Sequence, residues 1–349
     1  MSTPTLRPPA PGDPASGNPA PRPPAPGGPA PGGPALRGPV LVTVRLHRLT
    51  LWALPALLVL AAAFMFYQWR HTTTVAADFA GTGCSVERTT QACGDTVRYF
   101  VDSLSDLRRY LEYAGLALLV LPGLVGAFVA GPVIARELES GTYKLAWTQS
   151  VSPARWLAAR LAVPTLWAVV LLSVAVVLFR WAQATVPAGL YPLNWYDRLG
   201  FTGLGPLPVA YALFGIAVGA LIGLLVRRTV VAMSLALLTV GSVLALFNQY
   251  LRSRLWPTVT VEGKRQYFEE NAWVVQQGAV TPSGRRASYN ECLPIGPSPC
   301  ADSGGGLTHF VDYHPAAHFW PLQLVETGIV LALAAVAAFA AFRIVRRLG

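Results

Sequence analysis

Residues 206–247 read PLPVAYALFGIAVGALIGLLV, then Arg227 and Arg228, then TVVAMSLALLTVGSVLALF. Each apolar run is close to the roughly 20 residues that a helix needs to cross about 30 Å of hydrocarbon. Neither run alternates with period two, as a barrel strand would, and neither contains a charged residue. The stretch therefore predicts two membrane-spanning helices joined by a tight basic turn.

Four more apolar runs of similar length are spread along the chain. The six predicted spans are residues 51–68, 114–135, 157–179, 206–226, 229–247 and 321–342. Composition agrees, because 53% of the residues are hydrophobic and only 13% are charged, well below the roughly 25% charged residues of an average soluble domain. The sequence predicts an all-α integral membrane protein with six transmembrane helices. A cleaved signal peptide is disfavoured, because about fifty residues precede the first run.

Short basic segments predict the orientation. Lysine and arginine precede the first run, lie between the second and third, form the turn between the fourth and fifth, and end the chain. Six crossings place all of these on one side, which the positive-inside rule makes cytoplasmic. We expect a multi-pass cell membrane protein with both termini in the cytoplasm and outer loops at about 69–113, 180–205 and 248–320. The net charge of +10 then reflects topology and anionic lipid contact, not a nucleic-acid partner.

The four cysteines all fall in the expected outer loops. Cys84 and Cys93 lie in the first loop, and Cys292 and Cys300 lie in the third. Because disulfides persist outside the cytosol, we expect two bridges, and the pairings Cys84 with Cys93 and Cys292 with Cys300 are favoured because each closes a short loop. Unpaired thiols are the alternative. A metal site is disfavoured, because neither spacing is a close C-x-x-C knuckle.

Two regions lie outside this pattern of spans and short loops. Residues 1–40 hold nearly half of the chain's 30 prolines and too few large apolar groups to fold, so they predict a disordered cytoplasmic tail preceding a six-helix domain at 41–349. The long third outer loop is expected to contain a helix near 265–277.

The end of that third loop is rich in histidine. It carries His309, His314 and His318 together with Asp312. Histidine is a common metal ligand, but aromatic and histidine residues just outside a span usually lie at the headgroup boundary. We therefore interpret these residues as boundary residues and expect no metal site.

The sequence lacks the motifs of nucleotide and hydrolytic chemistry. Neither Lys144 nor Lys264 completes a P-loop G-x-x-x-x-G-K-[ST], and no zincin motif, nucleophile elbow or dinucleotide fingerprint occurs. We expect no enzymatic activity and no directly bound cofactor, and any energy from ATP must come from a separate chain. Glu326 is the main ionisable residue in a predicted span. It could be a pathway contact, be solvated at a cavity mouth, or be hydrogen-bonded to a neighbouring helix.

The most informative stretch follows the second span and reads ARELESGT at 135–142, then LAWTQSV at 145–151. Arg136, Glu137 and Glu139 place charge immediately beside the membrane, and Gly141 could end the helix in a left-handed cap. Trp147 contributes to an apolar side. A charged, amphipathic turn of this kind suits the docking of a soluble motor. An ordinary interfacial loop with aromatic anchors is the alternative.

These residues also resemble a known family. The Glu-x-Glu-x-Gly-Thr element at 137–142, LAWTQSV at 145–151 and RWL at 155–157 look like the loop of permease subunits of type-2 ATP-binding cassette (ABC) exporters, especially their actinobacterial branch. The resemblance covers 41–349 and includes the RLHR entry at 45–48. The extent of the cysteine-bearing outer region departs from the family.

The resemblance implies a separate energy source and a paired assembly. A cytoplasmic P-loop ATPase would dock on a coupling helix, and a second permease, identical or different, would complete the pathway. The coupling residues that it implies are Arg136, Glu137, Glu139, Gly141, Thr142 and Trp147. The sequence thus predicts the permease subunit of an ATP-driven exporter. A non-transporting immunity or signalling component and a secondary carrier are the alternatives, and the carrier is disfavoured because four spans lack midplane charges.

Overall fold

The computed structural model describes residues 48–348, except 88–89, 145–151, 187–192, 264–268, 270, 282–283, 289–290 and 292–307. The expectations for the tail at 1–40, for Trp147, and for Cys292 and Cys300 lie outside these residues.

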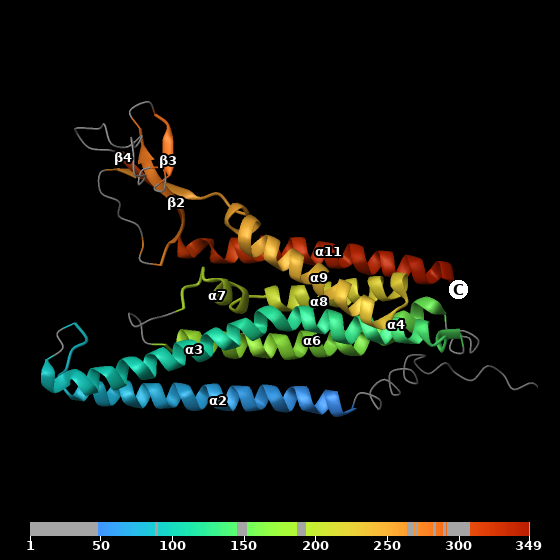
Figure 1. Ribbon diagram of the computed structural model, residues 1–349, viewed down its shortest axis with the longest axis horizontal. Helices are drawn as coiled ribbons and strands as arrows, with labels where there is room; N and C mark the ends of the chain where they lie inside the picture. The colour runs from blue at the N-terminus through green and yellow to red at the C-terminus, as the bar shows by residue number, and fades with distance from the viewer. Residues whose placement is uncertain are drawn as a thin grey trace, which may run out of the picture.

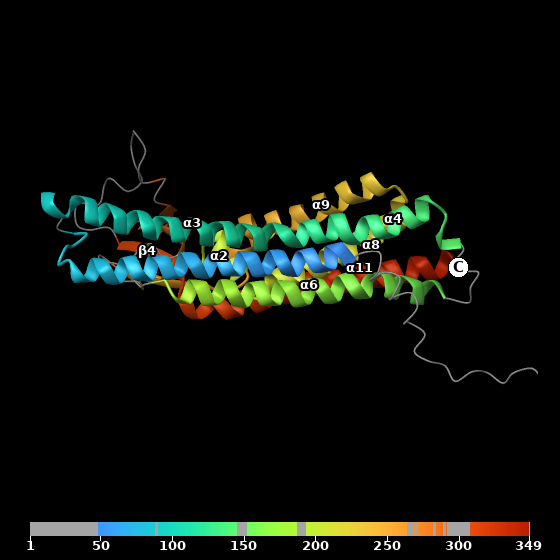
Figure 2. The same cartoon turned by 90° about the horizontal axis from the view of Figure 1, so that it is seen from below.

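Six described helices are long and apolar enough to cross a membrane, which confirms the predicted spans. They are α2 (Arg48–Gly81), α3 (Gly94–Val125) continued through the π-helical turn η2 (Gly126–Ala130) into α4 (Gly131–Glu139), α6 (Pro153–Ala184), α8 (Leu207–Val226), α9 (Thr229–Leu246) and α11 (Phe319–Leu348). They lie side by side along the long axis of the molecule (Figures 1 and 2).

The two ends of this bundle differ. The end of α4, the α8–α9 turn and the C-terminus lie at one end, which we call the elbow end (right in Figure 1). A β-sheet and the α2–α3 hairpin lie at the other, which we call the sheet end. The predicted tight turn at the elbow end is confirmed, because only Arg227 and Arg228 separate α8 from α9, and Arg227 has a φ of 53°.

Helices α2 and α3 extend well past the predicted spans. Most of the segment at 69–113, which we expected to be an outer loop, is therefore helical. The rings of Phe79 and Phe100 stack at 4.2 Å in this extension. The short 3₁₀ turn η1 (Gln91–Cys93) and the Cys84–Cys93 disulfide close the hairpin, which confirms the first predicted bridge.

Helix α8 lies at the centre of the bundle. Its side chains enter three separate clusters of buried hydrophobic residues. It also meets the second span backbone to backbone, because a Cβ added to Gly126 would lie 2.6 Å from the carbonyl oxygen of Gly215, and a Cβ on Gly219 would meet the carbonyl oxygen of Gly126. Small residues allow such close approach between membrane helices. The π-helical turn η2 thus packs directly on α8.

The segment between α9 and α11 contains a small antiparallel sheet. Its strands β1 (Val259–Gly263), β2 (Trp273–Val280), β3 (Arg286–Ser288) and β4 (Thr308–His314) are ordered β1-β4-β2-β3. The expected helix near 265–277 is wrong over 273–277, which belong to β2. The described residues are mostly helical, as predicted, and this sheet is the correction to the all-α prediction. Strand β2 contains Trp273, Val274 and Val275, and aromatic and β-branched residues fit a pleated surface.

Candidate functional site

The turn that follows α4 has the cap predicted for it. Helix α4 ends at Glu139, Ser140 caps it by donating its N–H to the Arg136 carbonyl oxygen at 2.9 Å, and Gly141 has a φ of +75°. Glycine adopts this left-handed conformation without a steric penalty. We call residues Arg136–Thr142 the elbow.

Glu137 joins the elbow to α6. Its Oε1 forms an ion pair with Arg160 Nη2 at 2.5 Å, and its Oε2 accepts a hydrogen bond from Trp156 Nε1 at 3.0 Å. Both partners lie in the first turns of α6, whose N-terminus is capped by Ser152. The carboxylate is therefore held from two directions, and α4 is fixed to the start of α6.

Glu139 joins the elbow to α9. Its Oε2 accepts hydrogen bonds from the backbone N–H and the Oγ1 hydroxyl of Thr229, at 3.1 Å and 2.7 Å. A carboxylate at this position satisfies an unpaired N–H at the start of a helix and interacts favourably with the helix dipole. Glu139 thus acts as a cap for α9 supplied by another helix.

The elbow still has an exposed face. Arg136, Ser140 and Thr142 are exposed, and the Ser140 and Thr142 hydroxyls lie 3.0 Å apart. The structure thus divides the four predicted coupling residues with described polar side chains into two groups. Glu137 and Glu139 connect the elbow to other helices of the same chain, whereas Arg136 and Thr142 face outward. Docking of a partner on this face stays a prediction.

Glu326 lies in a second polar cluster, toward the sheet end. It is fully buried on α11, and it forms a two-pronged ion pair with Arg252, whose Nε and Nη2 lie 2.8 Å and 2.9 Å from its two carboxylate oxygens. Tyr211 on α8 donates its hydroxyl to the same carboxylate at 3.0 Å. The interpretation of Glu326 as a solvated residue at a cavity mouth is wrong, and its hydrogen bonds to neighbouring elements are confirmed. A pathway role for Glu326 stays a prediction.

Arg252 is the residue that sequence reasoning missed. The apolar run ends at Phe247, so Arg252 was assigned to the outer loop, but the helix continues through the π-helical turn η3 (Phe247–Leu251) into the 3₁₀ turn η4 (Arg252–Arg254). The guanidinium lies over the Phe201 ring at 4.2 Å and donates to Asn248 Oδ1 at 2.6 Å. The four-residue spacing of Asn248 and Arg252 was the available signal.

At the sheet end, His314 and His318 lie in contact, but Asp312 does not join them. His314 is buried, and one of its ring nitrogens lies 3.1 Å from His318 Nδ1 and the other 3.1 Å from the Ser253 carbonyl oxygen. Burial lowers the pKa of His314. Asp312 instead pairs with Arg286 at 3.2 Å. Within the described part of the chain, no group of three or more His, Cys, Asp or Glu residues could hold a metal ion.

Six apolar helices, close packing at glycines and a charged cluster buried between helices define a multi-pass helical membrane protein. The model of the family described as ABC-2 membrane transporter related matches residues 55–252. That match spans more than half of the chain, so the chain belongs to this family of transporter membrane subunits. No match was found among curated proteins or among solved structures. The family match supports the type-2 ABC part of the resemblance and does not test the actinobacterial branch.

Proposed function

We propose that this chain is the permease subunit of an ATP-driven exporter and that its elbow docks on a separate cytoplasmic P-loop ATPase. The family supports this proposal, since permeases of this type pair with an ABC ATPase. The observation that carries it is the set of bonds at the elbow. Glu137 holds α6, Glu139 holds α9, and both residues belong to α4.

These bonds can transmit a displacement of the elbow to the rest of the helix bundle. A partner that moves the elbow would move the ends of α4, α6 and α9 together. Helix α4 also packs on α8, where a Cβ on Gly223 would lie 3.0 Å from the Gly131 carbonyl oxygen. Closure of two ATPase subunits around ATP would supply the free energy, because it can favour one arrangement of the helices over the other. A second permease would complete the pathway.

Two features support the orientation that this function needs, with the elbow end in the cytoplasm. Basic residues are concentrated at the elbow end, where the α8–α9 turn is Arg227–Arg228 and the last turn of α11 contains Arg346 and Arg347. The disulfide lies at the sheet end, and disulfides persist outside the cytosol. In this assignment the chain binds no ATP or other cofactor itself.

Co-purification tests the docking proposal. The chain is co-expressed with the ABC ATPases of its own organism, one at a time, and the ATPase recovered with the tagged permease is measured. Arg136→Glu reverses a charge on the exposed face of the elbow and leaves the Glu137 and Glu139 bonds in place. Because like charges across an interface are strongly unfavourable, we expect at least about a tenfold loss of bound ATPase.

Arg346→Glu is the matched control. Arg346 is also exposed and lies in the last turn of α11, outside the elbow, so the same charge change there should leave binding near wild type. Equal recovery of ATPase by wild type and by both variants, at equal membrane abundance, would show that the elbow is an ordinary interfacial loop.

A further inference from the structure

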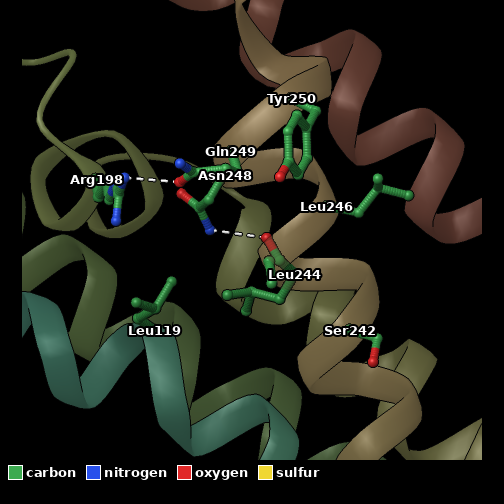
Figure 3. A pocket seen from close by; sticks show the side chains of 9 residues that line it. Leu119, Arg198, Ser242, Leu244, Leu246, Asn248, Gln249 and Tyr250 are labelled. Atoms are coloured by element: carbon green, nitrogen blue, oxygen red, sulfur yellow. Dashed lines mark hydrogen bonds between the residues drawn. The ribbon is translucent and has the colours of Figure 1, made fainter.

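A pocket lies near the sheet end, beside α9. It has a volume of about 640 Å³. Its wall is formed by Leu119 of α3, by Arg198 at the start of α7 (Arg198–Gly203), and by residues of α9 and η3 (Figure 3). We call it the α9 pocket. Its size falls in the range of about 300–1,000 Å³ typical of small-molecule sites.

One part of the α9 pocket is polar and cationic. Arg198 Nη2 donates a hydrogen bond to Gln249 Oε1 at 2.7 Å, and the Asn248 side chain lies beside Gln249 (Figure 3). A guanidinium has five N–H donors, so this bond leaves Arg198 able to donate to an anion as well. None of the described residues that line the pocket is acidic. The described residues that line the pocket therefore carry one positive charge and no negative charge.

The rest of the α9 pocket is apolar and continuous with surfaces that face lipid. Leu119, Leu244 and Leu246 line it. Leu246 is exposed, as are Val120 and Leu124 on the neighbouring face of α3. In a membrane-spanning bundle, the solvent of such exposed apolar surface is acyl chain.

The Arg198 guanidinium lies at the depth in the membrane that is expected for a phospholipid headgroup. The apolar span that contains α9 ends at Arg254. Gln249 and Tyr250 lie just inside that limit, and Tyr250 is largely exposed. Exposed tyrosines near the end of a span are typical of the membrane–water boundary. The Arg198 guanidinium is therefore placed where phospholipid phosphates lie, next to a groove that acyl chains can reach.

We propose that the α9 pocket binds an anionic phospholipid of the surrounding bilayer. Its phosphate pairs with Arg198 and Gln249, and an acyl chain lies along Leu119 and Leu246. Arginine is suited to phosphate, because its planar fork of N–H donors matches two phosphate oxygens. The proposal depends on membrane insertion and is independent of whether the chain exports a substrate.

Bound lipid would also affect the buried ion pair. Asn248 lines the pocket and accepts a hydrogen bond from Arg252, which holds Glu326. The π-helical turn η3 therefore has the pocket on one side and the ion pair on the other. Because a ligand that binds only the folded state stabilises it, occupancy should raise the unfolding temperature of the whole chain.

Native mass spectrometry of the full-length chain in detergent tests the proposal. Phosphatidylglycerol, phosphatidylcholine and diacylglycerol with identical acyl chains are titrated separately. We expect one phosphatidylglycerol to bind more tightly than the zwitterionic lipid, and diacylglycerol to bind weakest. Arg198→Gln should weaken the binding of that phosphatidylglycerol about tenfold and reduce the rise in unfolding temperature that it causes.

Two further variants separate the pocket from general charge. Arg254→Gln removes the same charge from an exposed neighbour that does not line the pocket, so it should bind lipid like wild type. Ser242→Trp fills the pocket from an exposed position and keeps Arg198, so it should block the site without disturbing the core.

Three outcomes would overturn the proposal. If Arg198→Gln and Arg254→Gln bind phosphatidylglycerol equally tightly, binding depends only on the overall positive charge of the protein. If diacylglycerol binds as tightly as phosphatidylglycerol, the phosphate does not contribute to binding. A change in oligomeric state of the lipid-free protein on Ser242→Trp would identify the pocket as a contact with a second copy.

Discussion

At the scale of single residues, the pairing of Glu326 with Arg252 explains how a carboxylate can lie inside an apolar bundle. The side chain of Arg252 is 4% exposed and that of Glu326 is 0% exposed. A buried pair is strongly destabilised when one partner is removed, since the other charge stays in a low-dielectric site, but removing both partners is often tolerated.

Arg252→Met should therefore destabilise the chain by about 3–5 kcal/mol, and the double variant Arg252→Met, Glu326→Leu should recover most of that loss. The measurement is the unfolding midpoint of each variant in the same detergent. A double variant no more stable than Arg252→Met alone would mean that Arg252 acts through its packing on Phe201 rather than through the ion pair.

Sequence reasoning reached only one half of this pair. Glu326 is conspicuous because it interrupts an apolar run. Arg252 is not, because the residues after Phe247 are mostly polar, and the four-residue spacing of Asn248 and Arg252 is too weak a signal to show that the helix continues through η3. Likewise, Glu139 could be recognised as part of a charged motif, but its bond to Thr229 joins residues ninety positions apart and depends on the packing of α4 against α9.

At the scale of elements, the close contact between α8 and η2 holds the second span in place. Gly219→Val should destabilise the chain by about 1–3 kcal/mol, because the new side chain would meet the Gly126 carbonyl oxygen and force the two helices apart. The unfolding midpoint and the size-exclusion profile in detergent measure the effect.

Gly241→Val is the matched control, since it makes the same change inside α9 where a Cβ would meet nothing within 4 Å. Valine is also a better helix former than glycine, so this variant should be at least as stable as wild type. Equal losses in the two variants would mean that close helix packing at Gly219 is unimportant.

The elements that could be predicted are those set by local sequence. Uninterrupted apolar runs identified all six spans, and Arg227–Arg228 identified the turn between α8 and α9. The helical extensions at 69–113 were missed because they contain both polar and apolar residues, so no continuous apolar run marks them. The contact between them at Phe79 and Phe100 joins two helices and is not visible in the local sequence. The sheet was missed because β2 pairs with β4, about 30 to 40 residues further along the chain, and such pairing leaves little local signal.

At the scale of the whole molecule, the chain has a different kind of structure at each end. The elbow end has one charged turn that connects three helices, and the sheet end has a disulfide-closed hairpin, a small sheet and the buried ion pair. This difference fits a membrane subunit that is driven from one side and opens on the other. The two ends are linked through α8, which contacts η2 and α4 and also carries Tyr211.

Stimulated ATP hydrolysis is the most direct test of this account. The full-length chain and the ABC ATPase that co-purifies with it are reconstituted in proteoliposomes, and hydrolysis is compared with that of the ATPase alone. The account predicts a several-fold higher rate with the wild-type chain. It also predicts that Gly141→Val, which strains a turn with a φ of +75°, loses this stimulation while inserting normally. A hydrolysis rate unchanged by the chain, or stimulated equally by wild type and Gly141→Val, would contradict the central claim.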